Sequence, residues 1–509
     1  MKKFTKPVAL SLAALTALAA CVTGCGSSPA KADSITVGVA NDIDSMDPNK
    51  TVSAGTREVL YNVYEGLVKP DSEGNLVPAV AESYEISDDQ TTYTFKLRDG
   101  VKFHDGSEVT ADDVVYSIER CADASDGNVL APAFSSIKSV EAPDDRTVVV
   151  TLNEADGDFL PYLTTAIVPA DNSDYENNPI GTGPYKFVSR SVGDSVVLQK
   201  FDDYWGDGTN GGNPAQIENV TVKAVTNPDT IITNLQGGSL DLFIHMTQDQ
   251  TDQLDDSFTI AEGTMNLVQA LYLNNSYEPF KDVRVRQALC YALDRQKIFD
   301  AVNSGKGTAL GSAVYPAYQK YFMPELVDTY TTDTEKAKEL LTEAGYPDGF
   351  EFTITVPSNY GPHVSTAQVL KEELADIGVT ADIQGVEWET WLSDVYQNRD
   401  YEATVIGVDA SALNAPALLG RYESTADNNF VNYNNSEYDE TYEKALASSD
   451  DDEKTALYKQ CETILSEDAA SVYIQDLPDF VAMDSRVTGY QYYPLYVLDL
   501  SALKLTDTQ

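Results

Sequence analysis

Hydrophobic and polar positions along this chain of 509 residues follow two different periods. Residues 92–97 alternate apolar and polar side chains, which predicts a strand that is buried on one face. Residues 110–120 instead repeat apolar side chains at helical spacing, and Thr110 with Asp113 three positions later is typical of a capping box. The pattern therefore predicts both strands and helices within the first quarter of the chain.

The first half of the chain is richer in strands than the second. Residues 34–40 predict an edge-forming strand, and residues 55–68 predict a helix because their apolar positions have helical spacing. Further strand-like segments of this half lie at 136–152, 195–201 and 218–225.

From about residue 275 to 480, helices and strands alternate. The predicted helices cover 282–296, 332–346 and 366–379, and the predicted strands cover 350–356, 380–386 and 401–408. Asp282 is placed to cap the first of these helices, and Gly345 is placed to end the second. This alternation indicates an α/β lobe with crossover helices. Two differently built lobes in one chain suggest a cleft between them.

The N-terminal residues have the order of a secretory signal peptide. Three lysines precede an uncharged apolar run of about sixteen residues, and small residues lead to Cys21 and Cys25. This run is shorter than the roughly 20 apolar residues that span a bilayer. We expect a signal peptide over residues 1–24, and a tether over residues 25–33 that follows a lipid-modified Cys25. The alternatives are lipidation of Cys21, a metal or redox pair, and a plainly cleaved signal.

Composition and charge narrow the class of protein. The formal net charge of −47 becomes −50 once the three signal-peptide lysines are removed, because residues 1–24 contain no acid. Such a surface repels phosphate backbones and anionic lipid head groups, so no nucleic-acid partner is expected. With 42% hydrophobic residues, the roughly 485 residues beyond the signal peptide are enough for two or three domains. No later apolar run approaches membrane-spanning length.

Catalytic motifs are missing from the sequence. It contains no Gly-x-Ser-x-Gly elbow, no His-Glu-x-x-His pair and no Gly-Lys-Ser/Thr phosphate loop. We therefore expect no enzymatic activity, no cofactor and no metal. The three histidines and three remaining cysteines are far apart and are interpreted as structural or surface histidines and buried thiols: His104, His245, His363, Cys121, Cys290 and Cys461.

One acidic, glycine-rich segment leaves a choice open. Asp202, Asp203 and Asp207 either surround a calcium ion or belong to a turn. The segment lacks the downstream glutamate that a calcium loop uses, which favours the turn.

Four segments resemble the family 5 extracellular solute-binding proteins of ABC importers, the class that includes oligopeptide- and dipeptide-binding proteins. The longest is "VPAVAESYEISDDQTTYTFKLRDGVKFHDGSEVTADDVVYSIER" at residues 77–120. "GTGPYKF", "FKDVRVRQALCYALDR" and "AKELLTEAGYPDGFEFTITV" follow in the same order at residues 181–187, 280–295 and 337–356. The resemblance covers nearly the whole chain beyond the signal peptide.

The resemblance implies an α/β, two-lobed clamshell of type II with an extra domain inserted into the first lobe. It implies a hinge where the chain crosses between lobes, near Leu273, Asn274 and Asn275 and again near Asp479 and Phe480. The implied ranges are 34–59, 182–272 and 482–509 for the first lobe, 60–181 for the inserted domain and 273–481 for the second lobe.

The resemblance also implies candidate ligand-binding residues. Asp409 follows the strand 401–408, at the position where peptide binders of this family hold the ammonium group of the ligand. The family usually has a tryptophan a short distance before this aspartate, whereas here Val408 precedes Asp409 directly. Asp409 alternatively caps the next turn. Arg421 either binds a ligand carboxylate or forms a surface ion pair. Trp388 and Trp391 either line the cleft or belong to the core.

The implied function is capture of a solute outside the membrane and its delivery to a permease driven by cytoplasmic ATPases. Peptide is the leading ligand, followed by oligosaccharide and by metal chelates. A monomer held at the outer face of the bacterial cytoplasmic membrane by its lipid is expected. A surface sensor with the same fold and a secreted hydrolase are the competing classes.

Overall fold

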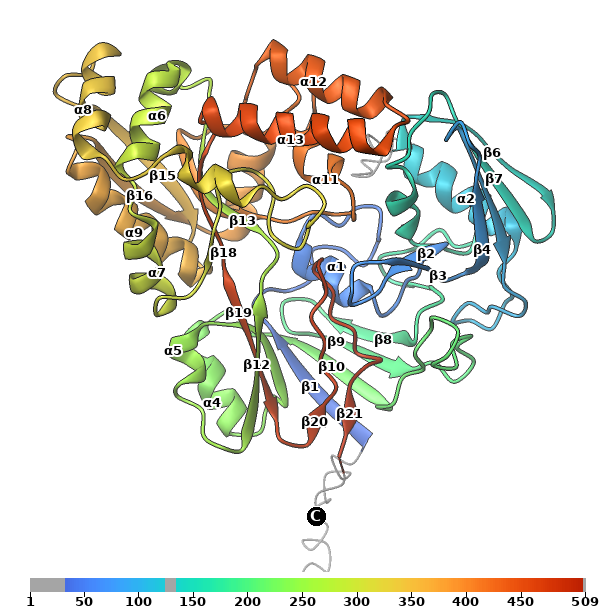
Figure 1. The fold of residues 1–509 in the computed structure, drawn as a ribbon. Helices are drawn as coiled ribbons and strands as arrows, with labels where there is room; N and C mark the ends of the chain where they lie inside the picture. The colour runs from blue at the N-terminus through green and yellow to red at the C-terminus, as the bar shows by residue number, and fades with distance from the viewer. Residues whose placement is uncertain (1–32, 124–133, 507–509) are drawn as a thin grey trace, which may run out of the picture.

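Three bodies surround a common centre in the computed structural model, which describes residues 33–123 and 134–506 (Figure 1). They are lobe I, built on a seven-stranded sheet, lobe II, built on a six-stranded sheet, and an inserted domain built on a four-stranded sheet. The predicted signal peptide, Cys21, Cys25 and most of the tether lie outside the described residues. Within these residues no helix combines the length and apolar character needed to cross a bilayer.

Lobe I places its first strand inside the sheet. The order is β12 (Phe258–Thr264), β19 (Pro478–Asp484), β11 (Leu242–Met246), β1 (Ser34–Val39), β10 (Asn219–Ala224), β9 (Ser195–Lys200) and β8 (Tyr185–Ser191). β1 pairs in parallel with β10 on one side and β11 on the other. The prediction of an edge strand at 34–40 was therefore wrong. Smaller elements of this lobe are η4 (Pro228–Thr230), α4 (Ile231–Gln236), α5 (Gln248–Thr251), β20 (Val487–Thr488) and β21 (Lys504–Leu505).

The helix predicted over residues 55–68 is shorter in the structure. α1 covers Ala54–Leu60, and the chain then turns into β2 (Val68–Pro70). Val63 and Leu67 beyond the helix are still fully buried. The helical spacing thus marked buried positions correctly, but tertiary packing rather than helix formation buries the second half of the segment.

Lobe II has the predicted alternation of helices and strands. Its sheet runs β14 (Thr308–Ala309), β18 (Val472–Asp476), β13 (Val268–Leu273), β17 (Ala403–Val408), β15 (Glu351–Pro357) and β16 (Thr380–Val386). The main helices are α6 (Val283–Ala292), α7 (Arg295–Asn303), α8 (Thr334–Glu343), α9 (Gly361–Ala375), α12 (Ser436–Ala447) and α13 (Asp451–Glu467). Shorter turns are η5 (Glu278–Lys281), η6 (Pro324–Thr329), α10 (Trp388–Thr390), η7 (Trp391–Gln397, a π-helix), α11 (Pro416–Leu419) and η8 (Gly420–Tyr422).

The predicted helix ends of this lobe are confirmed. The Asp282 side chain accepts a hydrogen bond from the Arg284 backbone N–H at the start of α6. Gly345, just beyond α8, has a φ of 97°, a left-handed conformation that favours glycine.

The inserted domain packs one helix against an antiparallel sheet. The sheet order is β4 (Ala81–Ile86), β5 (Thr92–Leu97), β7 (Thr147–Leu152) and β6 (Ile137–Asp144), and α2 (Ala111–Ala122) covers it. The small elements β2, β3 (Leu76–Pro78) and η3 (Leu160–Thr164) complete it. The predicted capping box is present, because the side chains of Thr110 and Asp113 each accept from the other residue's backbone N–H.

The two crossings between the lobes lie side by side. β12 of lobe I and β13 of lobe II are joined by residues 265–267, and β18 and β19 are joined by Leu477 alone. The two segments are bonded to each other, since the Met265 N–H donates to the Leu477 carbonyl and the Leu267 N–H donates to Asp476. In Figure 1 the β18–β19 and β12–β13 segments run together from the upper to the lower lobe.

The predicted position of the first crossing needs correction. Leu273 is the last residue of β13 and pairs with Ala403 of β17, and the Asn274 side chain donates to the Tyr401 carbonyl, so Leu273, Asn274 and Asn275 lie within lobe II. Asp479 and Phe480 lie in β19 of lobe I, directly beyond the second crossing. Lobe I was predicted to cover 182–272 and 482–509. In the structure its second segment instead ends after β12, and its last segment begins with β19.

Candidate functional site

A large cavity lies where the three bodies meet. Its volume is about 1480 Å³, and its walls come from lobe I, lobe II and the inserted domain. This volume exceeds the roughly 300–1,000 Å³ of typical small-molecule pockets. Residues far apart in sequence reach it, including Asn41, Tyr162, His245, Trp388 and Tyr496.

In the lobe I wall, a histidine lies between two buried carboxylates. His245 Nδ1 lies 3.1 Å from Asp479 Oδ1, and its Nε2 lies 3.1 Å from Glu58 Oε2. The nearby negative charges of Asp479 and Glu58 outweigh burial, which acts in the opposite direction, and raise the pKa of His245 well above its usual value. The imidazole is therefore cationic at neutral pH, and the ring of Tyr496 packs 5.2 Å from it.

The local backbone explains how His245 reaches this position. The pairing of β11 with β19 shifts register between Phe243 and Met246, and His245 has a φ of 58° within that irregularity. Such bulges re-aim a side chain at the cost of strain for a residue other than glycine. Here the bulge turns the imidazole toward α1 and the cavity.

The lobe II wall is aromatic. Trp388 and Trp391 stack with ring centroids 5.2 Å apart and planes 5° from parallel, and the Tyr360 ring meets Trp388 at 5.4 Å. Trp391 is only 4% exposed and its Nε1 donates to Thr404 Oγ1, whereas Trp388 is half-buried. Both line the cavity, but Trp391 belongs mainly to the core and Trp388 is the ring left available for contact.

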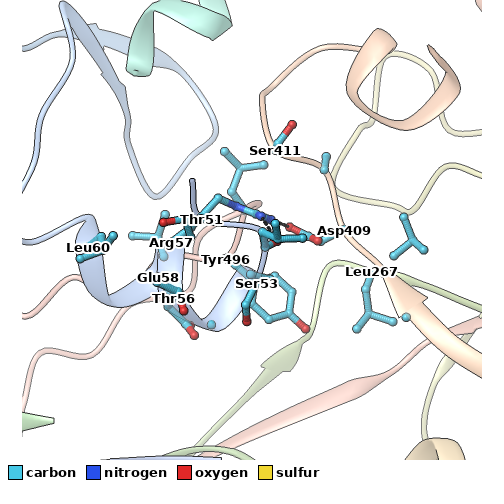
Figure 2. Close-up of a pocket in the computed structure, with 18 of the residues that line it drawn as sticks. Thr51, Ser53, Thr56, Arg57, Glu58, Leu60, Leu267, Asp409, Ser411 and Tyr496 are labelled. Atoms are coloured by element: carbon cyan, nitrogen blue, oxygen red, sulfur yellow. Dashed lines mark hydrogen bonds and ion pairs between the residues drawn. The ribbon is translucent and has the colours of Figure 1, made fainter. Parts of the chain in front are cut away.

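Two groups of residues connect the lobes across the cavity. Asn41 of lobe I donates through its amide to the Tyr360 hydroxyl, at 2.9 Å, and accepts from the Asn359 amide of lobe II. Arg57 on α1 of lobe I forms an ion pair with Asp409, which follows β17 of lobe II; Arg57 Nη2 lies 2.5 Å from Asp409 Oδ2. Figure 2 shows these two side chains extending toward each other from opposite walls.

Arg421 also lines the cavity, one helical turn after α11 begins. Its guanidinium forms no ion pair with a carboxylate in residues 33–123 and 134–506, and its Nη2 atom donates to the Ala417 carbonyl at 3.5 Å. The Nε atom is buried without a hydrogen-bond partner in this part of the chain. The surface ion pair considered for Arg421 is thus not formed within the described part of the chain.

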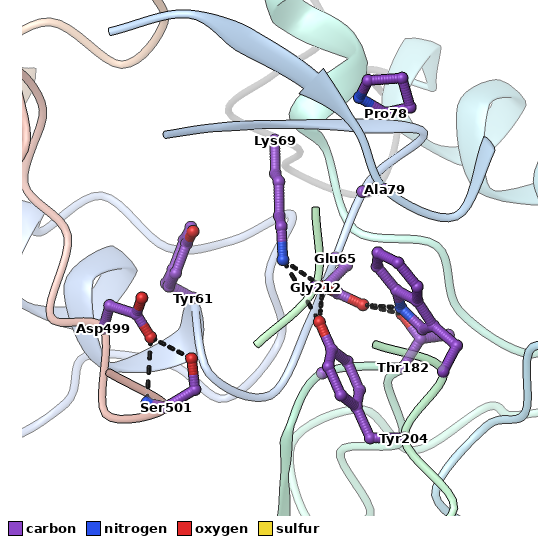
Figure 3. A network of polar contacts seen from close by, with 12 residues as sticks. Tyr61, Glu65, Lys69, Pro78, Ala79, Thr182, Tyr204, Gly212, Asp499 and Ser501 are labelled. Atoms are coloured by element: carbon purple, nitrogen blue, oxygen red, sulfur yellow. Dashed lines mark hydrogen bonds and ion pairs between the residues drawn. The ribbon is translucent and has the colours of Figure 1, made fainter. Parts of the chain in front are cut away.

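Glu65 shows how the junction of the inserted domain with lobe I is fixed (Figure 3). Its buried carboxylate accepts hydrogen bonds from Lys69 at 3.1 Å and from the Tyr204 hydroxyl and Trp205 indole at 2.7 Å each. Because every oxygen is satisfied, this carboxylate adds no unpaired charge to the cavity that it borders.

The other candidate residues lie elsewhere. His104 is half-buried against the Gly183 carbonyl, His363 is buried against the Gln269 amide, and Cys121, Cys290 and Cys461 are buried free thiols. Asp207 accepts from the Thr209 backbone and hydroxyl in a turn, and Asp203 pairs with Lys102. The described residues contain no cluster of three or more histidine, cysteine or carboxylate side chains suited to a metal ion.

The structure thus brings Asp409, Arg421, Trp388 and Trp391 together around one cavity. Sequence reasoning did not single out Arg57 or Tyr360 and interpreted His245 as structural or surface. Arg57 was visible as the one basic side chain of the segment 55–68, but its partner lies 352 positions away. No sequence signal indicated the bulge that positions His245.

Comparisons with known proteins agree with this architecture. Residues 75–430 match the sequence model of the bacterial extracellular solute-binding proteins, family 5 (middle region). The chain belongs to this family. Family 5 proteins are the substrate-binding components of ABC importers and are solute-binding proteins rather than a family of enzymes.

Individual relatives in family 5 carry different ligands. Heme-binding protein A of Haemophilus influenzae is 31% identical over 477 residues, which cover 85% of each chain. The oligopeptide-binding protein AppA of Bacillus subtilis, solved with a nonapeptide, is 26% identical with a TM-score of 0.83, covering 93% of this chain and 99% of that one. DppA of Helicobacter pylori, solved with the peptide STSA, is 27% identical with a TM-score of 0.84, covering 93% and 98%.

Proposed function

We propose that this protein captures short peptides in the cavity between its lobes and delivers them to a membrane permease driven by cytoplasmic ATPases. The observation that supports this most directly is the cavity of about 1480 Å³ whose walls come from both lobes and the inserted domain. A ligand held there contacts all three bodies at once, so its binding energy favours the closed arrangement.

Peptide is favoured over the other ligands that we considered. The structural relatives AppA and DppA were solved with peptides in the same fold. The half-buried Trp388 and the cavity-lining Tyr360 provide apolar surface for side chains. An oligosaccharide remains the alternative, because an exposed indole face also stacks on sugar rings.

Native mass spectrometry of the purified protein tests this proposal. We expect a retained ligand whose mass and fragmentation correspond to a short peptide. A retained sugar, or a protein that exchanges no peptide from a defined mixture, would contradict the peptide proposal while leaving the family assignment intact.

We propose that the hinge for closure of the two lobes lies at the two crossings, residues 265–267 and Leu477. The two crossings are short, adjacent and hydrogen-bonded to each other, so the backbone of both can rotate about one common hinge axis. Asp479 and Phe480 flank this hinge, whereas Leu273 to Asn275 are packed within lobe II.

We also propose that Cys25 carries the lipid that holds a monomeric protein at the outer face of the bacterial cytoplasmic membrane, with Cys21 as the alternative. Durable anchoring requires about two acyl chains. Replacement of Cys25 by Ala should release the protein into the soluble fraction, and mass spectrometry of the wild-type N-terminus should show a diacylglycerol on Cys25. An unmodified Cys25 would contradict this assignment.

A further inference from the structure

Asp409 is occupied by a cation that the protein itself provides. Arg57 and Asp409 lie on opposite walls of the cavity, and their side chains are 31% and 19% exposed. The contact between Arg57 Nη2 and Asp409 Oδ2 is a charge-assisted hydrogen bond, which is stronger than a neutral one. The pair is therefore neither a fully exposed surface contact nor buried beyond reach of a ligand.

The guanidinium is fixed in the orientation that reaches Asp409. Its second nitrogen, Nη1, donates to the Val52 carbonyl at 2.8 Å, just before α1. That backbone is itself held by Asp44, whose carboxylate accepts from the N–H groups of Val52 and Ser53 at 2.9 Å each. Although burial acts in the opposite direction, Asp409 and then Asp44 raise the pKa of Arg57, so it keeps its charge.

An ammonium group on a ligand has to displace this guanidinium to reach Asp409. Displacement breaks a charge-assisted hydrogen bond and leaves Arg57 facing the cavity without its carboxylate, which is costly in a partly buried site. A ligand without an ammonium group at this point leaves the pair intact and gains from the closed arrangement that the pair already favours. The internal ion pair thus selects against ligands with a cationic end at this position.

We propose that Arg57 is a specificity-determining residue that pairs with Asp409 across the closed cleft and so excludes ligands that place a free ammonium group there. The proposal rests on the proposed function, because it names the chemistry of the ligand in the same cavity. In this proposal, the role of Asp409 is to position Arg57 and to connect lobe II to lobe I. Suitable ligands present a neutral or blocked end to this pair.

The first experiment needs no ligand. The purified protein is stripped of retained ligand by unfolding and refolding, and small-angle X-ray scattering measures the closed and open populations. We expect Arg57→Gln and Asp409→Asn each to lower the closed-to-open ratio about tenfold, which corresponds to about 1.4 kcal/mol. The double variant should lose no more than either single variant, because both remove the same contact.

Two further variants make this result specific. Exchange of the charges, Arg57→Asp with Asp409→Arg, should restore much of the closed population. Lys320→Gln removes a cation whose ion pair with Asp451 lies within lobe II, and it should leave closure unchanged. Equal scattering from the wild type, both single variants and the exchanged pair would overturn the role of this ion pair in closure.

The second experiment measures selectivity by calorimetry with trialanine and N-acetyl-trialanine. The wild type should bind N-acetyl-trialanine about tenfold or more tightly than trialanine, because a free ammonium group has to displace Arg57, whereas Arg57→Gln should prefer the free amine by about tenfold or more, because it leaves Asp409 unpaired. Equal binding of the two peptides by the wild type, or a wild-type preference for the free amine that disappears in Asp409→Asn, would overturn the proposal. If no variant binds either peptide, the peptide function itself fails, and the scattering experiment still decides whether Arg57 and Asp409 hold the cleft closed.

Discussion

His245 illustrates how one residue combines strain, charge and position. Its left-handed backbone places a cationic imidazole between Glu58 and Asp479, both nearly fully buried. Buried carboxylates without a partner would be costly, so the imidazolium stabilises the wall of the cavity. The strain at the bulge is offset by these two contacts.

Because the pKa of His245 is raised on folding, its protonation should make stability depend on pH. The stabilisation is fully present below the unfolded pKa of about 6.5 and is lost as pH rises through the higher pKa of the folded state. The difference in unfolding free energy between wild type and His245→Asn should therefore shrink between pH 7 and pH 10. Urea denaturation at each pH measures it.

His104 supplies the matched control. Burial lowers the pKa of His104 to about 4, so it stays neutral throughout that range. The difference in unfolding free energy between wild type and His104→Gln should be constant from pH 7 to pH 10. If the difference between wild type and His245→Asn were equally constant, His245 would not change charge in this pH range.

Trp388 allows a direct measurement of ligand contact. In a Trp391→Phe background, the fluorescence of the remaining tryptophans should shift when the ligand identified by mass spectrometry binds, because Trp388 lines the cavity and Trp205 does not. A Trp388→Phe variant should lose this response. An unchanged emission spectrum in the Trp391→Phe protein would place Trp388 outside the binding site.

At the residue scale, the sequence indicated some cavity residues and not others. Asp409 and Trp388 were found because they follow recognisable strands in a resembling family. Arg57 could not be assigned from sequence, because its importance depends on a partner in the other lobe. Nor could the sequence reveal that Asp409 is already paired.

Among the elements, α2 depends on a local signal that can be tested by itself. Thr110 Oγ1 accepts from the Asp113 N–H at 3.3 Å, and Asp113 Oδ2 accepts from the Thr110 N–H at 2.9 Å. Thr110→Ala should lower the free energy of unfolding by about 1 kcal/mol, measured by denaturant titration. Thr342→Ala, at an exposed position inside α8, should have no such cost because alanine favours helix interiors. Equal losses of unfolding free energy in Thr110→Ala and Thr342→Ala would show that loss of the helix cap is not the cause.

Elements with strong local signals were the ones that sequence predicted well. α2, α6 and α8 carry caps and apolar faces that specify them without distant contacts. The predicted helix at 55–68 failed beyond Leu60 because residues 62–67 are buried by contacts with other parts of the chain. β1 was misplaced because pairing partners from residues 219–224 and 242–246 determine its position in the sheet.

On the scale of the whole molecule, the inserted domain is attached to lobe II by a buried cluster. Lys454 Nζ lies 3.1 Å from Asp158 Oδ2, the Tyr458 hydroxyl donates to the same oxygen at 2.8 Å, and the Asn414 amide donates to the Asp158 carbonyl. Asp158 belongs to the inserted domain, and the other three belong to lobe II. This cluster holds the third wall of the cavity in place.

Lys454→Met should destabilise the protein by about 3–5 kcal/mol, because the buried Asp158 carboxylate loses its cation. Adding Asp158→Asn to that variant should recover a substantial part of the loss, since the uncompensated charge is then gone. Urea denaturation measures both. A double variant no more stable than Lys454→Met would show that the ion pair is not the source of the effect.

The positions of the crossings could not be read from the sequence to within a few residues. β12 and β13 are separated by only three residues, and β18 and β19 by one, so no loop signal marks the change of lobe. The membership of each strand is decided by its neighbours in the two sheets, which are distant in sequence.

The place of β19 has a consequence for the order in which the protein folds. β19 follows all of lobe II in the sequence, yet it lies between β12 and β11 inside the lobe I sheet. While a nascent chain has not yet reached residue 478, β12 has no partner and the sheet of lobe I cannot be completed. A chain emerging from its N-terminus therefore remains without a finished first lobe until nearly all of it has been synthesised, and we expect this late, non-local strand pairing to slow its folding.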